Sequence, residues 1–419
     1  MRIGLVIEEF DPLRGGVEQW TWQAAEQLTR RGHEVHVIAR RFSDQAATIP
    51  IVAHPLGQVG ERVAFAEAAS QKLRTLSLDV VHDTGCGYDC DVFQPHGGSR
   101  VAAAAQNLLL IAPWMRAAKQ AISRVLPRYR QFGELSARQY IDDGRAVLAL
   151  SRRVADDLVR LHGVRPERIR LIYNGVDTDR FSPAHRRRFR RPVRAELGID
   201  DDSLMLLLVA HNFRLKGVPM LLDAVARWPH ATPVNLVVVG GKHIGRYVRA
   251  AHRRGLADRV RFVGAVDDTV PYYAAADVYV HPTFYDPCSL VVLEALAGGL
   301  PVVTSRQNGA GELMVDGREG ALLDDPADVA EFWRRIEPLL DARRRAEMAR
   351  AARQLAVRHT FEQNIDELIA VYQEAYQLRR QAEDEMMARF TRPFECRIHG
   401  KSSEKVTRRH SPHDTGVLS

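Results

Sequence analysis

The sequence predicts an α/β protein built from two doubly wound domains. The chain has 419 residues, more than the roughly 250 to 300 residues that one hydrophobic core usually organises. Short β-branched segments alternate with longer helical patterns, which is typical of a parallel sheet wrapped by helices. A polar, proline-containing stretch at residues 183–202 interrupts the alternation, which then begins again.

The first domain, over residues 1–182, opens with a strand at Ile3–Ile7. A glycine-bearing loop, Asp11–Gly16, leads into a helix that ends near Arg31, where Gly32 stops it. The remaining strands predicted for this domain are His33–Ala39, Val80–Asp83, Val92–Gln94 and Ala146–Leu150.

Residues 183–202 are expected to form a polar linker, because they combine prolines, five arginines within 186–191 and an acidic triplet at 200–202. The second doubly wound domain covers 203–360. Its predicted strands are Leu204–Ala210, Leu236–Gly240, Val260–Val263, Asp277–His281, Pro301–Thr304 and Ala321–Leu323. Residues 361–380 are expected to form a helix that packs back toward the first domain, and 381–419 a disordered basic tail.

Composition limits the class of protein. Hydrophobic residues make up 46% and charged residues 26% of the chain, and no nonpolar stretch reaches the roughly 18 residues of a membrane-spanning helix. The nonpolar run at the N-terminus is too short for a signal peptide and ends in Glu8 and Glu9, so we expect a cytoplasmic protein. Four scattered cysteines, among them Cys396, indicate neither a disulfide framework nor a zinc site.

The net charge of +7 comes mainly from arginine, and net charge alone does not distinguish nucleic acid, anionic lipid and phosphorylated small molecules as partners. The sequence has no basic patch interleaved with aromatic residues and no recognised nucleic-acid-binding module. We therefore expect no nucleic-acid partner.

Candidate binding residues follow the predicted strands. In open α/β sheets ligands bind beyond the carboxyl ends of the strands, so two such domains in tandem predict a site in the cleft where those ends face each other. Gly15 and Gly16 precede a helix, where absent side chains let a ligand approach the backbone amides. A tight turn is the alternative, and the three-glycine dinucleotide pattern is absent.

Two pairs of charged residues lie at strand ends of the second domain. Arg214 and Lys216 precede a helix and suit a diphosphate that gains charge as it leaves; a solvated loop is the alternative. Asp286 and Glu294 follow the strand Asp277–His281, and their carboxylates can accept hydrogen bonds from sugar or ribose hydroxyls. Alternatively, Asp286 begins a helix and Glu294 is a packed polar residue.

Together these features resemble family 4 of the retaining glycosyltransferases, which have the GT-B fold of two Rossmann-like domains facing across a cleft. The resemblance covers roughly residues 1–380, and within the family it is greatest for lipopolysaccharide core glucosyltransferases. Its most specific part is the pair of carboxylates with seven residues between them, ahead of a glycine-proline segment. The matching segments are Gly15-Gly16, Asp91-Val92-Phe93, Glu167-Arg168, Asn174-Gly175-Val176-Asp177, Lys216-Gly217-Val218 and Ala276-Asp277 through Pro301-Val302-Val303.

The resemblance implies transfer of a hexose from a nucleotide sugar, UDP-glucose, to a lipopolysaccharide core or related lipid-linked glycan. It implies retention of anomeric configuration by front-face attack, with no metal and no other cofactor. An enzyme of exopolysaccharide or O-antigen synthesis with another donor sugar is the nearest alternative. A nonenzymatic carbohydrate- or nucleotide-binding protein of this fold is the alternative from a different class.

The resemblance also implies roles for single residues. Asp286 would contact the donor sugar and Glu294 the ribose, while Lys216 with Arg214 would hold the diphosphate. The nucleotide pocket would also be lined by Leu290 and Val291. His96 occupies the region where many relatives place a histidine near the sugar; a core or surface histidine is the alternative.

Four positions depart from the family pattern. Asp286 stands where a glutamate is usual, so its reach is shorter by a methylene and the donor sugar stays open. Leu215 replaces the arginine that directly precedes the lysine in the core glucosyltransferase. That enzyme also has acidic residues at the positions of Trp20 and Gly97, so its acceptor contacts do not carry over.

Residues 107–130 mix large nonpolar side chains with arginines and a lysine. Basic amphipathic segments of this kind can lie in a lipid interface. The resemblance implies a peripheral contact with the inner face of the cytoplasmic membrane. A core-packing helix with a solvated basic face is the alternative.

Overall fold

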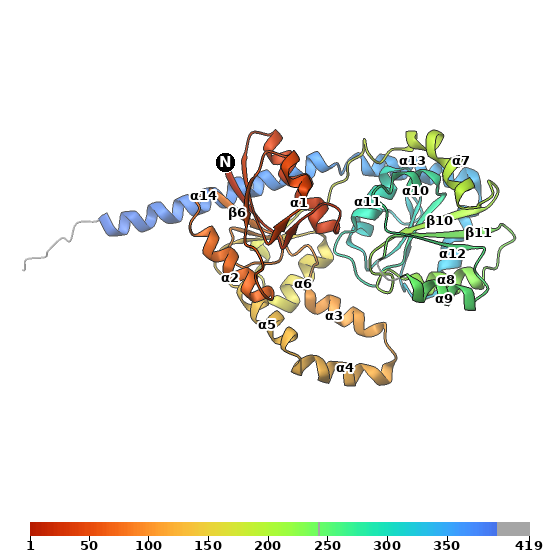
Figure 1. Ribbon diagram of the computed structural model, residues 1–419, viewed down its shortest axis with the longest axis horizontal. Coiled ribbons are helices and arrows are strands. Elements are labelled where there is room, and N and C mark those ends of the chain that lie inside the picture. Colours follow the sequence, from red (N-terminus) through yellow and green to blue (C-terminus); the bar gives the residue numbers. More distant parts are fainter. Residues whose placement is uncertain (242–243, 392–419) are drawn as a thin grey trace, which may run out of the picture. The chain divides into compact units, whose positions relative to one another are not determined.

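The computed structural model describes residues 1–241 and 244–391 (Figure 1). Residues 1–377 form one compact unit and 378–419 another. In the described part of the first unit, two large parallel sheets of seven and six strands are wrapped by helices. The predicted α/β fold with two doubly wound sheets is therefore confirmed.

The first sheet has the strand order β5-β3-β1-β6-β7-β8-β9, and all neighbouring strands are parallel. Its strands are β1 (Arg2–Val6), β3 (Glu34–Ala39), β5 (Val52–Pro55), β6 (Val80–Asp83), β7 (Val92–Phe93), β8 (Ala146–Ala149) and β9 (Ile169–Leu171). All five predicted strands are present. The two edge strands β5 and β9 were not predicted, because β5 is largely exposed, β9 is only half-buried, and neither has a continuous hydrophobic pattern.

Helices in the connections between the strands of this sheet complete the first domain. They are α1 (Gly16–Arg30), α2 (Arg62–Leu73), α3 (Arg100–Leu109), α4 (Pro113–Val125), α5 (Pro127–Gln139) and α6 (Arg152–His162). A small separate sheet pairs β2 (Glu9–Phe10) with β4 (Arg41–Phe42). It lies in the connections that follow β1 and β3, near the start of α1.

The second sheet has the order β12-β11-β10-β13-β14-β15, again parallel throughout. All six predicted strands are present, as β10 (Leu204–Val209), β11 (Val234–Val239), β12 (Val260–Gly264), β13 (Val278–His281), β14 (Val302–Ser305) and β15 (Gly320–Leu323). The helices around it are α8 (Val218–Ala226), α9 (Gly245–Arg253), α10 (Val270–Ala275), α11 (Leu290–Ala297), α12 (Val329–Ile336) and α13 (Ala342–Ala356).

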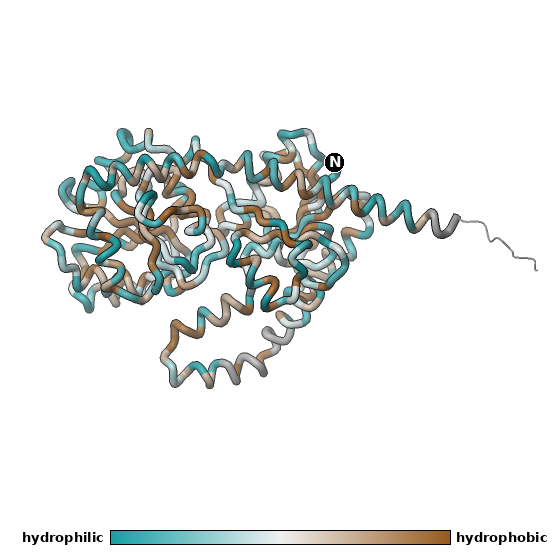
Figure 2. Tube along the Cα trace, turned by 180° about the vertical axis from the view of Figure 1, so that it is seen from behind, coloured by the Kyte–Doolittle hydropathy of each residue, from teal (hydrophilic) through white to brown (hydrophobic). Residues whose placement is uncertain are grey.

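Five of the six strands of the second sheet are buried on both faces, and the edge strand β12 is partly buried. Along β10, Leu204, Leu206 and Leu208 pack into one hydrophobic cluster and the alternate residues into another, as the two-residue repeat of a strand requires. Figure 2 shows the most hydrophobic stretches running through the strands of both sheets. This double burial explains why these strands could be predicted from the sequence.

Residues 183–202 are not an extended polar linker. They contain a 3₁₀ turn at Pro183–His185 and the helix α7 (Arg186–Glu196), which packs on α10. Arg194 is 1% exposed and binds the carboxylate of Asp277 at 3.1 Å. The arginine run looks solvated in the sequence because its buried acidic partner lies 83 residues away.

The last described helix, α14 (Phe361–Thr391), returns to the first sheet. Phe361, Ile365, Leu368 and Tyr372 share a hydrophobic cluster with strands β1 and β3 and with helix α1. Residues 381–391 are helical where a disordered tail was expected, and 392–419, with Cys396, lie outside the described residues. None of the helices described is both long and nonpolar enough to cross a membrane.

Candidate active site

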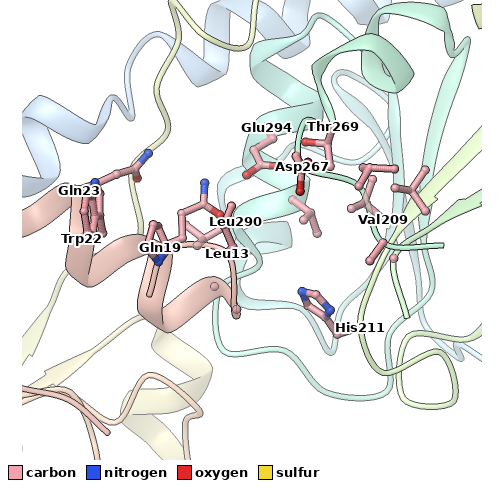
Figure 3. Close-up of a pocket in the computed structure, with 18 of the residues that line it drawn as sticks. Leu13, Gln19, Trp22, Gln23, Val209, His211, Asp267, Thr269, Leu290 and Glu294 are labelled. Atoms are coloured by element: carbon pink, nitrogen blue, oxygen red, sulfur yellow. The ribbon is translucent and has the colours of Figure 1, made fainter. Parts of the chain in front are cut away.

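A cavity of about 510 Å³, here called the first cavity, lies at the carboxyl ends of strands from both sheets (Figure 3). Its lining residues come from the loops and strand ends at the carboxyl ends of β1 in the first sheet and of β10, β11 and β12 in the second. Both β1 and β10 lie where the strand order reverses, between β3 and β6 and between β11 and β13 respectively. This is the position in which doubly wound sheets bind ligands.

Helix α1 and the loop before it form one wall of the first cavity. Gln19, Trp22 and Gln23 line this wall in Figure 3, together with Leu13 from the loop. The first helical hydrogen bond runs from the Gln19 amide to the Gly15 carbonyl, so the amides before it have no partner within the helix. A Cβ atom on Gly16 would lie 3.4 Å from Leu290 Cδ1, so the start of α1 comes close to α11.

Helix α11 supplies the opposite wall, with Leu290, Val291 and Glu294 among the lining residues. Glu294 is 7% exposed, and its Oε2 atom accepts a hydrogen bond of 2.8 Å from the Tyr273 hydroxyl. Burial raises the pKa of Glu294 to about 7, and the Tyr273 hydrogen bond and the charge of Arg180 oppose that rise. Oε1 makes no hydrogen bond within the described residues, so it is available to a ligand.

Lys216 and Asp286 form a partly buried ion pair, with 2.5 Å between Nζ and Oδ2. Their side chains are 17% and 13% exposed, and His281 Nε2 lies 3.6 Å from the same carboxylate oxygen. Burial alone would raise the pKa of Asp286, but the charge of Lys216 and the hydrogen bond from His281 outweigh it and hold that pKa well below its usual range.

The loops that carry this pair approach each other closely. The Phe284 amide donates to the Leu215 carbonyl at 2.9 Å. Gly217 has a φ of +82°, and a Cβ atom there would lie 2.4 Å from the Pro282 carbonyl oxygen. Only glycine fits this contact, so Gly217 holds Lys216 beside Asp286.

Comparison with known proteins agrees with this arrangement. Residues 14–180 match the family model described as Glycosyltransferase Family 4, and residues 204–342 match that described as Glycosyl transferases group 1. Each model falls on one of the two sheets. The chain belongs to the family 4 glycosyltransferases.

Similar curated proteins carry one recurring name. The D-inositol 3-phosphate glycosyltransferase 2 of Catenulispora acidiphila is 36% identical over 49% of this chain, which spans half (50%) of that relative's length. The D-inositol 3-phosphate glycosyltransferase of Mycolicibacterium smegmatis is 28% identical over 86% of each chain.

Two solved structures share the fold. The crystal structure of WaaG, a glycosyltransferase involved in lipopolysaccharide biosynthesis, has a TM-score of 0.74 at 21% identity and covers 90% of this chain and 99% of that chain. Anabaena HepE, solved in complex with UDP and glucose, has a TM-score of 0.65 at 22% identity and covers 88% and 98%. These likenesses confirm the GT-B fold.

The glycosyltransferase brings some of the predicted site residues into one cavity and leaves others outside its lining. Gly15, Gly16, Leu290, Val291 and Glu294 line the first cavity. The described lining does not include the Lys216–Asp286 pair, Arg214 or His96. The guanidinium of Arg214 donates to the Leu110 carbonyl, just beyond the end of α3.

His96 lies in a buried polar cluster. It is 8% exposed, and its ring centroid is 4.5 Å from that of Trp20. Burial, with a smaller contribution from His82, lowers the pKa of His96 to about 3, so its ring is neutral at pH 7. Trp20 is itself buried and donates to Asn364 at 3.1 Å, which leaves Trp22 as the tryptophan that lines the cavity.

The sequence analysis did not single out several lining residues. His211 follows β10, while Asp267 and Thr269 follow β12, so a search of every strand end would have found them. Arg180 follows the matched segment that ends at Asp177, and both line the cavity. In the described ranges, no group of three or more His, Cys, Asp or Glu side chains is arranged to hold a metal ion.

Proposed function

We propose that this glycosyltransferase moves a hexose from UDP-glucose to an acceptor hydroxyl, with retention of the anomeric configuration and without a metal ion. The observation that carries the proposal is the first cavity, which places the start of α1 opposite Glu294 at the carboxyl ends of both sheets. The Lys216–Asp286 pair lies in the loops that follow β10 and β13 of the same sheet edge.

The nucleoside would bind against the second sheet. Val239 ends β11, Gly240 follows it and Val266 lies after β12, and together they offer a largely nonpolar surface for a base. Glu294 would accept hydrogen bonds from the ribose hydroxyls through Oε1, because Oε2 is taken by Tyr273.

The diphosphate would lie between the start of α11 and Lys216. Amides in the first turn of a helix and a nearby ammonium group both favour an anion. Lys216 would release the carboxylate of Asp286 and bind the diphosphate instead. Asp286 would then accept a hydrogen bond from a hydroxyl of the sugar. Fixed positive charge at this point stabilises the leaving group as its negative charge grows.

In the transfer step the bond between the anomeric carbon and the diphosphate oxygen breaks on the face where the new bond forms. The acceptor oxygen bonds to that carbon, and its proton passes to the departing diphosphate. Attack and departure on one face retain the configuration.

Two observations bear on the acceptor. Exposed nonpolar side chains on α3 and α4 favour a lipid-linked acceptor, a lipopolysaccharide core or related cell-surface glycan. The printed names of the similar curated proteins favour a second candidate, a small phosphorylated polyol such as D-inositol 3-phosphate.

A panel of nucleotide sugars tests the proposal. At about 100 times its Kd, UDP-glucose is expected to raise Tm by roughly 3 °C, since ligand binding to the folded state stabilises it. GDP-mannose and ADP-glucose are the comparison ligands. Transfer is then measured with UDP-glucose and either lipopolysaccharide core or D-inositol 3-phosphate, which separates the two acceptors. A melting curve that no nucleotide or nucleotide sugar shifts would contradict the donor site.

We further propose a peripheral contact with the inner face of the cytoplasmic membrane through residues 107–130. Figure 1 shows α4 standing away from the first sheet, joined to it through α3 and α5. Trp114 is 80% exposed, Ile122 58% and Leu126 40%. The side chains of residues 120–121, 123–125 and 127–130 lie outside the described part of the chain. Large exposed nonpolar side chains on one helical segment favour a lipid surface.

Vesicle binding tests this contact. The protein is expected to bind vesicles rich in anionic lipid at least about tenfold more tightly than neutral vesicles, because basic side chains add roughly 1 kcal/mol each near an anionic surface. Trp114→Glu should weaken binding. Val315→Glu changes a side chain that is 57% exposed in the second domain and is the matched control. The contact would be refuted if the affinity for vesicles did not depend on lipid charge. It would also be refuted if both variants weakened binding equally.

A further inference from the structure

A second cavity, of about 640 Å³, lies at the opposite ends of the strands of the second sheet. Asp277 and Pro301 line it and directly precede β13 and β14, whereas the first cavity follows the carboxyl ends of its strands. The other walls come from α7 and α13, which Figure 1 shows on the same side of the sheet. We call it the basic cavity, and its charged lining residues are Arg186, Arg190, Asp277, Arg345, Arg350 and Arg353.

The carboxylate in the described lining of the basic cavity, that of Asp277, already binds arginines. Asp277 is 7% exposed and binds Arg190 at 2.7 Å and, behind the cavity lining, Arg194 at 3.1 Å. Arg186 lies 3.9 Å from the same carboxylate. Arg194 also lies 3.7 Å from the exposed carboxylate of Asp201, so three arginines share two negative charges and the cluster is positive before α13 is considered.

The three α13 arginines that line the basic cavity have no acidic partner within the described residues. Arg345 donates through Nη1 to the carbonyls of Leu339 and Leu340, at 2.7 and 2.8 Å. Arg353 donates through Nη1 to three carbonyls at 2.9 Å, among them that of Ala297 at the end of α11. Because a guanidinium carries five N–H donors, both retain Nε and Nη2 for another acceptor.

Arg350 is the most available of these cations. It is exposed, lines the basic cavity, and makes no hydrogen bond or ion pair with any described residue. The crowding affects its neighbours, because burial and then the charge of Arg190 lower the pKa of Arg186. Like charges that converge on one space repel each other, and an anion bound between them would remove that repulsion.

We infer that the basic cavity is a binding site, separate from the first cavity, for a small molecule that carries two adjacent phosphate groups. Arginine forks bind phosphate oxygens in pairs, and cations from α7 and α13 reach one space from two sides. The volume is that of a small-ligand site. Convergence on a cavity favours a compact anion over an extended nucleic acid, which a basic stripe would suit better. This inference does not depend on the proposed function.

Inorganic pyrophosphate is the probe, and binding is measured by calorimetry at fixed ionic strength. Arg345→Ala/Arg350→Ala is expected to weaken binding by at least about tenfold, since hydrogen bonds to charged groups are stronger than neutral ones. Both residues lie on α13, and the Arg190–Asp277–Arg194 cluster stays intact. Circular dichroism and Tm should match the native protein.

Arg343→Ala/Arg344→Ala is the matched control, because it removes the same charge from the same helix. Both residues pair with Glu347 and neither lines the basic cavity. This variant should bind pyrophosphate within about twofold of the native affinity, the scatter expected of changes that touch nothing at the site. Lys216→Ala should keep the binding event that Arg345→Ala/Arg350→Ala weakens, even if it loses a second one at the proposed donor site. The inference fails if pyrophosphate does not bind at millimolar concentration or if both double variants lose affinity equally. It also fails if Lys216→Ala alone abolishes binding, since the anion would then occupy the first cavity's side of the sheet.

Discussion

Replacing Lys216 by alanine is expected to lower kcat by about 10²- to 10³-fold, the loss typical of removing one fixed group that stabilises charge in a transition state. The ammonium group of Lys216 is held in place by Asp286 and by the Tyr285 carbonyl, so it needs little reorganisation when a diphosphate arrives. The measurement is kcat for sugar transfer, or for donor hydrolysis if no acceptor is found. Arg214→Ala is the control, and it should have the smaller effect because Arg214 donates to the Leu110 carbonyl.

A structural role for Lys216 must be separated from a role in charge stabilisation. Removing the lysine leaves the carboxylate of Asp286 without its cation, and breaking a buried pair can itself destabilise a fold. The affinities for UDP and for uridine distinguish the two roles. Lys216→Ala should weaken UDP binding and leave uridine binding unchanged. An equal loss for both ligands would indicate damage to the fold.

Glu294 should make the stability of the native protein fall as pH rises. Its pKa is about 7 in the folded protein and 4.5 in the unfolded chain. Below pH 4.5 the carboxyl is protonated in both states and carries no penalty. Between pH 4.5 and 7 the unfolded chain releases the proton while the folded protein holds it, so unfolding becomes easier. From the pKa difference, the loss is roughly 3 kcal/mol.

Glu294→Gln removes the titrating group and keeps a hydrogen-bond acceptor for Tyr273. The variant should gain stability relative to the native protein by roughly 3 kcal/mol between pH 4.5 and 8. Urea unfolding of both proteins at pH 4.5, 6 and 8 measures this difference. Parallel pH profiles would show that the pKa of Glu294 is the same in the folded and unfolded states, and the burial account of its pKa would then be wrong.

The central strands could be predicted because each is buried on both faces and therefore has a continuous hydrophobic sequence. The edge strand β5 could not, since Val52 and two of its neighbours are exposed. Helix α7 was missed for an electrostatic reason. Its arginines look solvated until the buried carboxylate of Asp277, far along the chain, is known to bind two of them.

The candidate site, like the fold, has parts that could be predicted from the sequence and parts that could not. Gly16 and Glu294 could be placed in one cavity because doubly wound sheets bind ligands beyond the carboxyl ends of their strands, and both residues follow such strand ends. The pairing of Lys216 with Asp286 could not, because it depends on how closely Gly217 approaches the Pro282 carbonyl. The hydrogen bond from Arg214 to Leu110 likewise joins segments 104 residues apart.

Helix α14 has a consequence for how this polypeptide is made. The side chains of Phe361, Ile365 and Tyr372 complete the packing of the sheet formed by the earliest part of the chain. Domains generally fold in the order in which the ribosome produces them. Here the first sheet keeps one face uncovered until Phe361 to Tyr372, far along the chain from β9, have been translated.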